Sequence, residues 1–308
     1  MNPNNDVRRS IESYSKLRAK WIAALVGSHP NAIWLQMSHM LREEVWFKTV
    51  VRLRDSGGNP PVNGYVWDTF TTGYGVKQSL AIRRLTDRDK GTASLLRIVM
   101  DMRSNSHYFT RQIVVGHDGT SMDVDELHQQ LIQSIAYDED GVGRIDPIKF
   151  QQWSDADLSH RAFDRLRAAG IEKPRLSCDK IDDEVLNKLE VALTGDVFKR
   201  VRNRCDTYLA HADLSDLASA IEGPTYNDIH QCVATLVEVR QFLRGDFLNH
   251  SSGPVVPFPH GKHLRDLSEP LVPKFSDSIY ADAWKRSAAE VESWAAIDRI
   301  RRFAVHQE

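Results

Sequence analysis

The sequence contains little cysteine and no long apolar run. Its 308 residues include three cysteines, Cys178, Cys205 and Cys232, which are far apart and form no Cys-x-x-Cys pair. That number and spacing fit a reducing compartment better than a disulfide framework or a cysteine zinc site. No run of about 18 apolar residues is present that would span a bilayer, and the N-terminal residues lack the apolar core of a signal peptide. These absences predict a soluble, cytoplasmic protein without a membrane partner.

An excess of charge of one sign is also missing. Lysine and arginine number 40, and aspartate and glutamate number 42, so only local clusters can indicate nucleic-acid binding. The sequence has no Walker phosphate loop, HExxH zinc-protease motif or GxSxG elbow. His260 and His263, with His250 nearby, lack a cysteine or a paired carboxylate at ligand spacing. The acidic turn at 138–141 lacks the twelfth-position glutamate of a calcium loop, where Lys149 stands. We therefore expect no metal and no cofactor.

Apolar residues recur at helical spacing along most of the chain. The expected helices cover 6–26, 30–54, 65–86, 92–103, 124–137, 155–169, 182–194, 197–213, 226–247 and 278–303. A short extended piece is expected at 112–115. Almost every strong period is helical and no internal repeat is evident, so the pattern predicts an all-α bundle.

The chain is expected to form a single domain over 1–308. Its main helices come from two blocks, 6–104 and 180–250. The remaining parts are an inserted excursion at 105–179, a proline-rich surface loop at 251–275 and an extra C-terminal helix at 276–306.

The predicted helix at 197–213 carries several basic side chains and a histidine. Arg204 and His211 stand seven residues apart, almost two α-helical turns, so both side chains would leave one face about 10 Å apart along the axis. An arginine can bind a phosphate through two parallel hydrogen bonds. A histidine can exchange a proton near neutral pH. This pair therefore suits chemistry at a phosphate group.

The six residues between Arg204 and His211, with a polar residue among them and Ala-His-Ala-Asp at 210–213, resemble the Arg-x(4–6)-His signature of the HEPN superfamily. In detail they are similar to its abortive-infection U-type branch, a set of bacterial defence proteins. A second segment resembles the Arg-Leu-x-Asp…Ser-Leu pattern found upstream of the motif in that branch. This segment is AIRRLTDRD at 81–89, followed by Ser-Leu-Leu at 94–96.

The resemblance implies a HEPN-like helical bundle that pairs as a homodimer, with two Arg–His helices meeting at one cleft. Many proteins of this superfamily are metal-independent endoribonucleases, and some are toxins that a partner silences. The resemblance covers about 30–105 and 180–250 and leaves the excursion and the C-terminal segment unassigned. The family usually has a polar residue directly after the motif arginine, whereas Cys205 follows Arg204 and Asn203 follows Arg202. Arg204 is the favoured motif arginine, and Arg202 remains an alternative.

In the reaction that these residues permit, the ribose 2′-hydroxyl attacks the neighbouring phosphorus. His211 would serve as acid or base, and Arg204 would stabilise the charge of the transition state. Asn203 and Asp206 would orient His211 or hold the ribose. Tyr208 would stack on a base or donate to a phosphate.

Further basic residues are candidates for RNA binding through the backbone charge of the RNA. They are Arg200 and Arg202 on the motif helix, and Arg83 and Arg84 on the upstream segment.

Three other interpretations of the same residues remain open. The basic residues of the motif helix would form an ordinary solvated face, and His211 would be a partly buried residue near a helix end. Alternatively, the chain would be a catalytically silent helical module that binds RNA or a partner protein. By analogy it would also be one half of a pair with a nucleotidyltransferase antitoxin that modifies Tyr208.

Overall fold

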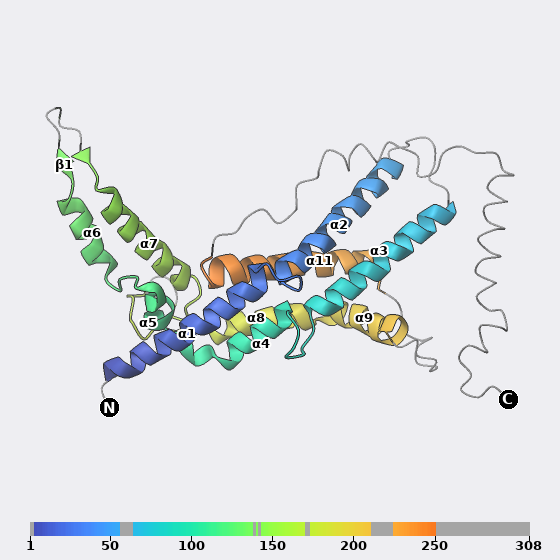
Figure 1. Cartoon of the computed structure of the whole chain (residues 1–308), viewed down its shortest axis with the longest axis horizontal. Helices are drawn as coiled ribbons and strands as arrows, with labels where there is room; N and C mark the ends of the chain where they lie inside the picture. The colour runs from blue at the N-terminus through green and yellow to red at the C-terminus, as the bar shows by residue number, and fades with distance from the viewer. Residues whose placement is uncertain are drawn as a thin grey trace, which may run out of the picture. The chain divides into compact units, whose positions relative to one another are not determined.

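The computed structural model describes residues 3–55, 64–137, 140, 143–169, 173–210 and 224–250. In this part of the chain the structure is mostly helical, which confirms the predicted all-α bundle (Figure 1). Its strands, β1 (Ala136–Tyr137) and β2 (Gly143–Arg144), pair antiparallel with Ala136 opposite Arg144. The chain groups into two units, 1–257 and 258–308, and every described residue belongs to the first. The predicted proline-rich loop and C-terminal helix lie outside the described residues.

The first block forms four helices close to the predicted ranges. They are α1 (Pro3–Val26), α2 (Ile33–Asp55), α3 (Gly64–Leu85) and α4 (Leu95–Ser104). The start of α4 follows from its sequence, because the Ser94 hydroxyl accepts a hydrogen bond from the Arg97 N–H at 3.0 Å and caps the helix. Ser94 also donates to the Asp87 carbonyl at 2.5 Å and thereby ties the α3–α4 connection to the cap.

The second block forms α8 (Asp183–Thr194), α9 (Asp196–Arg204) and α11 (Tyr226–Gln241). Two of these helices continue into π-helical turns: α9 into η3 (Cys205–Ala210), and α11 into η4 (Phe242–Phe247). Thr225 begins α11 with a capping box, in which Thr225 and Asp228 bond each other's backbone N–H groups.

The two blocks share one core. Helix α3 contacts α2, α9 and α11, and α4 contacts α8. Buried apolar side chains of α1, α2, α3 and α4 form a single cluster with those of α8, α9 and α11. Since burial of apolar surface is the dominant favourable term in folding, neither block has a complete core without the other.

The excursion is not wholly outside this core. It contains η1 (Ser106–Tyr108), α5 (Arg111–Val114), η2 (Gly116–Asp118), α6 (Val124–Gln133) and α7 (Pro147–Asp164). Its Phe109 is 2 % exposed, and the ring stands edge-on to Tyr14 of α1 and to Phe247 of η4. Helices α6 and α7 lie side by side as a hairpin joined through β1 and β2 (Figure 1).

Three local predictions were wrong. The helix expected at 124–137 ends at Gln133, and Ala136 and Tyr137 form strand β1 instead. The extended piece expected at 112–115 is the single helical turn α5, in which the N–H groups of Val114 and Val115 bond to the carbonyls of Thr110 and Arg111. Helix α7 begins eight residues before the expected position 155. The Asp146 carboxylate caps it by accepting from the N–H groups of Ile148 and Lys149, and Pro147 suits its first turn.

Candidate functional site

The site predicted from the sequence lies on α9 and η3. The apolar side of this helix consists of Phe198, Val201 and Cys205, which are at most 3 % exposed and face the core. With this side fixed inward, Arg202 and Arg204 are half-buried and Asn203 is exposed. The residue after Arg204, which departs from the family pattern, is therefore a core residue. Burial raises the pKa of the Cys205 thiol to about 11, so this thiol is protonated at neutral pH and unsuited to act as a nucleophile.

The geometry assumed for Arg204 and His211 changes at Cys205. Helix α9 ends at Arg204, and the next six residues, Cys205–Ala210, form a π-helix. A π-turn bonds residue i to i+5 and holds more residues than an α-turn. Side chains beyond Arg204 therefore do not follow the α-helical spacing that would place position 211 on the same face as Arg204. His211 and the side chain of Tyr208 lie outside the described residues.

The structure brings together two predicted site residues from segments 123 positions apart. Arg83, in the last turn of α3, donates from Nε to Oδ1 of Asp206 in η3 at 2.5 Å. Both side chains are partly exposed, at 39 % and 49 %. This ion pair joins the upstream segment to the motif helix, and these are the two parts of the chain that carry the family resemblance.

A second arginine of the motif helix lies near another positive charge. The pKa of Arg202 is lowered, first by burial of its guanidinium and then by the charge of Arg88, whereas the charge of Asp206 acts in the opposite direction. Two cations held near each other, one of them partly desolvated, favour the approach of an anion. Arg84, which follows Arg83 in the last turn of α3, is exposed.

Arg200 is held by the fold. Its guanidinium donates to Oδ1 of Asp228 on α11 at 2.5 Å, and this hydrogen bond holds the pKa of the Asp228 carboxyl below its usual range. Asp228 also closes the capping box of α11. Arg200 thus connects the motif helix to its neighbour, and an RNA phosphate would compete with Asp228 for it.

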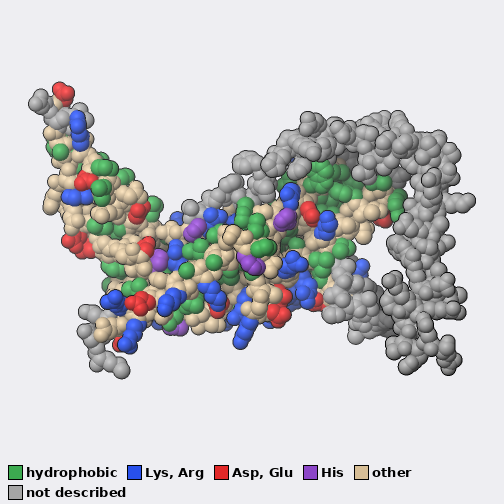
Figure 2. Space-filling model, viewed as in Figure 1, with side chains coloured by type: hydrophobic (Ala, Val, Ile, Leu, Met, Phe, Trp, Pro, Cys, Tyr) green, Lys and Arg blue, Asp and Glu red, His purple; other side chains and the backbone are tan. Residues whose placement is uncertain are grey.

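The charged side chains on one face of the molecule do not form a stripe of a single sign. Figure 2 shows Lys and Arg side chains mixed with Asp and Glu over the face in view. This pattern agrees with the near balance of positive and negative residues in the sequence. Any attraction of RNA would therefore be local to the arginines of α3, α9 and their neighbours.

Sequence reasoning missed a polar cluster between α2, α3 and α11. The Tyr74 hydroxyl donates to Oε2 of Glu44, and Nδ1 of His230 lies 2.6 Å from Oε1 of the same carboxylate. Lys48 pairs with Glu44 at 2.8 Å. Burial and the hydrogen bond to Glu44 raise the pKa of Tyr74, so the phenol remains a proton donor. The sequence feature that indicates this cluster is Glu44 itself, because it is a charged residue on the apolar face of α2 that also contains Met40 and Phe47.

Comparisons with protein-family models, with curated proteins and with solved structures find no match to this chain. Within the described ranges, no helix combines the length and the apolar character needed to cross a bilayer. In that same part of the chain, no three histidine, cysteine or acidic side chains gather in a group that would hold a metal ion.

Proposed function

We propose that this chain is a metal-independent endoribonuclease of HEPN type, with its site on α9 and η3 beside the end of α3. The observation that supports the proposal most is the charge arrangement at this surface. Arg88 lies near half-buried Arg202 and lowers its pKa, while the Arg83–Asp206 pair joins the two segments. A phosphate placed there would relieve the repulsion between the cations, and RNA supplies such phosphates.

Each residue of the site would have a distinct role. Arg204 would stabilise the negative charge of the transition state through the hydrogen bonds and positive charge of its guanidinium. His211 would transfer the proton of the 2′-hydroxyl or of the 5′-leaving oxygen. Asn203 is exposed and would contact the ribose. Asp206 is engaged by Arg83, so its role would be to position this arginine rather than to orient His211.

The proposal includes a homodimer formed through the motif helices. A second protomer would supply a second Arg–His pair, so that one histidine can act as base and the other as acid. As a biological role we propose a toxin or a phage-defence effector that a partner such as a nucleotidyltransferase antitoxin restrains.

The test compares wild type with Arg204→Ala, Arg202→Ala and His211→Ala on RNA in buffer containing a chelator. We expect His211→Ala to lower the cleavage rate by about 10²–10⁴-fold, the usual contribution of general acid–base catalysis. Arg204→Ala should lower it by about 10²–10³-fold, the usual cost of removing one charge-stabilising donor. Products should end in a 2′,3′-cyclic phosphate. Arg8→Ala is the matched control, because Arg8 is an exposed arginine on α1 that pairs with Glu12.

Circular dichroism melts of all variants would show that loss of cleavage is not loss of folding. If Arg202→Ala abolishes cleavage and Arg204→Ala does not, Arg202 is the motif arginine. If purified wild type is inert on RNA and harmless when expressed, the nuclease proposal fails. The silent binding module would then be tested by RNA binding alone.

A further inference from the structure

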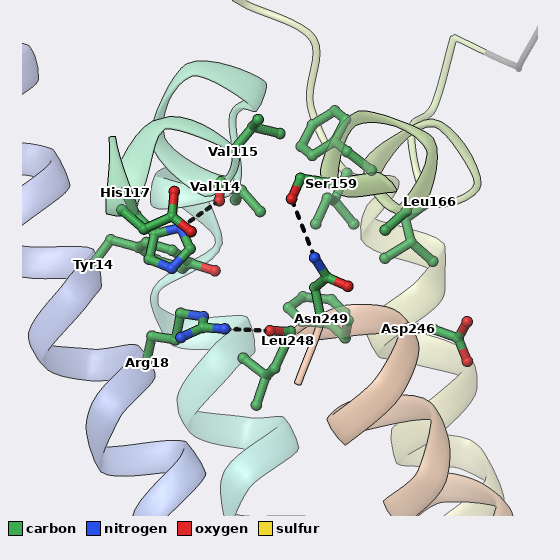
Figure 3. A pocket seen from close by; sticks show the side chains of 15 residues that line it. Tyr14, Arg18, Val114, Val115, His117, Ser159, Leu166, Asp246, Leu248 and Asn249 are labelled. Carbon is green, nitrogen blue, oxygen red and sulfur yellow. Dashed lines mark hydrogen bonds between the residues drawn. The ribbon is translucent and has the colours of Figure 1, made fainter. Parts of the chain in front are cut away.

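A cavity of about 50 Å³ lies away from the motif helix. Its walls come from α1, the α5–η2 turn, α7 and the end of η4 (Figure 3). One part of the wall is apolar and includes Val115, Phe163 and Leu166. The other part is polar and includes Tyr14, Arg18 and His117. The cavity therefore has an apolar side and a polar side.

Tyr14 places an unused donor at the polar side. Its side chain is 0 % exposed, and among the described residues no group hydrogen-bonds its hydroxyl. The ring is held edge-on by Trp21, Phe109 and His117, so the hydroxyl cannot readily turn elsewhere. Burial raises the pKa of this phenol, which keeps the proton on the oxygen. Buried hydroxyls in proteins are normally hydrogen-bonded, and this one belongs to a side chain that lines the cavity.

Arg18 supplies the positive charge. It stands four residues after Tyr14 on α1, and therefore on the same helix face. One of its nitrogens donates to the Leu248 carbonyl at 2.6 Å (Figure 3), which leaves other N–H groups of the guanidinium for a ligand. Its charge affects the pKa of the Tyr14 phenol and of the His117 ring more strongly than the charge of Asp118 does. The polar side therefore favours an anion.

The neighbouring groups limit the ligand to a single negative charge. Burial and then Arg18 lower the pKa of His117, so its ring is neutral at pH 7. Its Nδ1 donates to the Val114 carbonyl at 2.8 Å (Figure 3). The Asp118 carboxylate accepts from the N–H and hydroxyl of Thr120. Asp246 pairs with Arg165 at 3.4 Å. Arg18 is thus the cation that remains for a ligand among these pocket residues.

The rim is built from an unusual stretch of backbone. The π-helix η4 ends at Phe247, and Asn249 follows in the left-handed region at φ 43°. The amide of Asn249 donates to the Ser159 hydroxyl on α7 at 3.3 Å (Figure 3). Residues in left-handed backbone and π-turns both occur preferentially at functional sites. This contact joins η4 to α7 beside the cavity.

We propose that this cavity binds a small monocarboxylate with a short hydrocarbon tail. The carboxylate accepts from the Tyr14 hydroxyl and from the guanidinium of Arg18, and the tail lies against Val115, Phe163 and Leu166. The small size of the cavity limits the hydrocarbon tail to a few atoms. This site is independent of the proposed ribonuclease activity and needs no residue of the motif helix.

The test uses sodium propionate, with sodium chloride and neutral propionamide as controls at equal concentration. With a dissociation constant on the order of 1 mM, 100 mM propionate should raise the melting temperature of the whole chain by about 5–10 °C. Saturation transfer from protein to the propionate methyl protons should show direct contact. Tyr14→Phe and Arg18→Met should each remove both effects, whereas Tyr108→Phe, a tyrosine outside the cavity, should retain them.

Tyr14→Phe removes an unpartnered hydroxyl and keeps the ring, so this variant should fold as stably as wild type. If it does not fold, Arg18→Met carries the test. An equal effect of propionamide would overturn the requirement for an anion. The absence of any effect, or the same effect in both pocket variants, would mean that the cavity holds ordered water only, and the proposal would fail.

Discussion

The side chain of Arg240 lies in the core of the bundle. It is 0 % exposed, and its guanidinium carbon stands 4.7 Å from the centroid of the Trp34 ring. Among the described residues no group hydrogen-bonds its Nε, Nη1 or Nη2. Burial, and then the charge of Arg244, lower its pKa to about 10. A cation–π contact contributes roughly 0.5–2 kcal/mol, whereas desolvation of a buried ion costs several kcal/mol. The net effect of this charge on folding is therefore unfavourable.

Arg240→Met should leave the free energy of unfolding unchanged or raise it by about 1–4 kcal/mol, as seen when buried charges are replaced by apolar residues of similar volume. Urea denaturation monitored by tryptophan fluorescence would measure the change. Arg103→Met is the control, since Arg103 is an exposed arginine paired with Glu190, and exposed pairs contribute about 0–1 kcal/mol. A loss of stability in Arg240→Met well beyond that of the control would show that the guanidinium has an anionic partner.

At the scale of elements, a buried network of charges fastens the excursion. Arg111 of α5 donates to Asp164 of α7 at 2.5 Å and to Asp179 at 3.1 Å, and its guanidinium lies over the Phe163 ring. Arg175 donates to the second oxygen of Asp164 at 2.8 Å, and Arg167 donates to Asp179 at 2.9 Å. These contacts hold one helical turn, the end of α7 and the following segment in a fixed arrangement.

Asp164→Asn should lower the free energy of unfolding by about 3–5 kcal/mol at pH 7, because it leaves the buried Arg111 without one of its carboxylates. Burial alone would raise the pKa of Asp164, but hydrogen bonds and charges from Arg111 and Arg175 outweigh burial and lower it. The stabilisation is therefore complete above about 3.9, the pKa of an aspartate in the unfolded chain. It is lost as the pH falls through the lower pKa that Asp164 has in the folded protein.

The difference in the free energy of unfolding between wild type and Asp164→Asn should accordingly be largest from pH 5 to 7 and shrink below about pH 4. Denaturation curves at several pH values would measure it. Asp155→Asn on the same helix is the control, because this exposed carboxylate accepts a hydrogen bond from Gln151 one turn before it. A difference that is constant down to pH 2, or a variant as stable as the control, would contradict this account.

The helices were predictable from the sequence because apolar side chains repeat at their period, as in α1 and α3. The π-helical turns η3 and η4 were not predictable, because their amino-acid composition does not differ from that of an α-helix. The ion pair between Arg83 and Asp206 was not predicted, because neither periodicity nor spacing indicates which side chains of two distant segments meet. The Arg111 network and the Glu44 cluster join distant single positions, and such contacts leave no periodic signal in one sequence.

At the scale of the whole molecule, the proposed RNA binding must overcome a formal net charge of −2. Long-range attraction is therefore weak, and affinity must come from local contacts between arginines and phosphates. Such contacts release counterions, so the logarithm of the affinity for single-stranded RNA falls with the logarithm of salt by about 0.7 for each neutralised phosphate.

Arg202→Ala should lower the magnitude of this salt slope by about 0.7 if Arg202 binds one phosphate. Fluorescence anisotropy of a labelled single-stranded RNA, titrated at several salt concentrations in the cleavage-deficient His211→Ala background, would measure it. Arg8→Ala in the same background should keep the slope of its parent, since Arg8 lies on α1 outside the cluster. Equal slopes for both variants would exclude a phosphate contact at Arg202.

The contact between Arg18 and the Leu248 carbonyl joins residues 230 positions apart, and α1 also packs through Tyr14 against Phe109, which meets Phe247. On the ribosome, α1 is the first of the described helices to be made. At ordinary rates of translation its apolar face waits on the order of 10–50 s for these last partners. During that time the nascent chain exposes the part of the α1 face that these last partners cover. Synthesis of this protein thus places a demand on the chaperones that shield emerging chains.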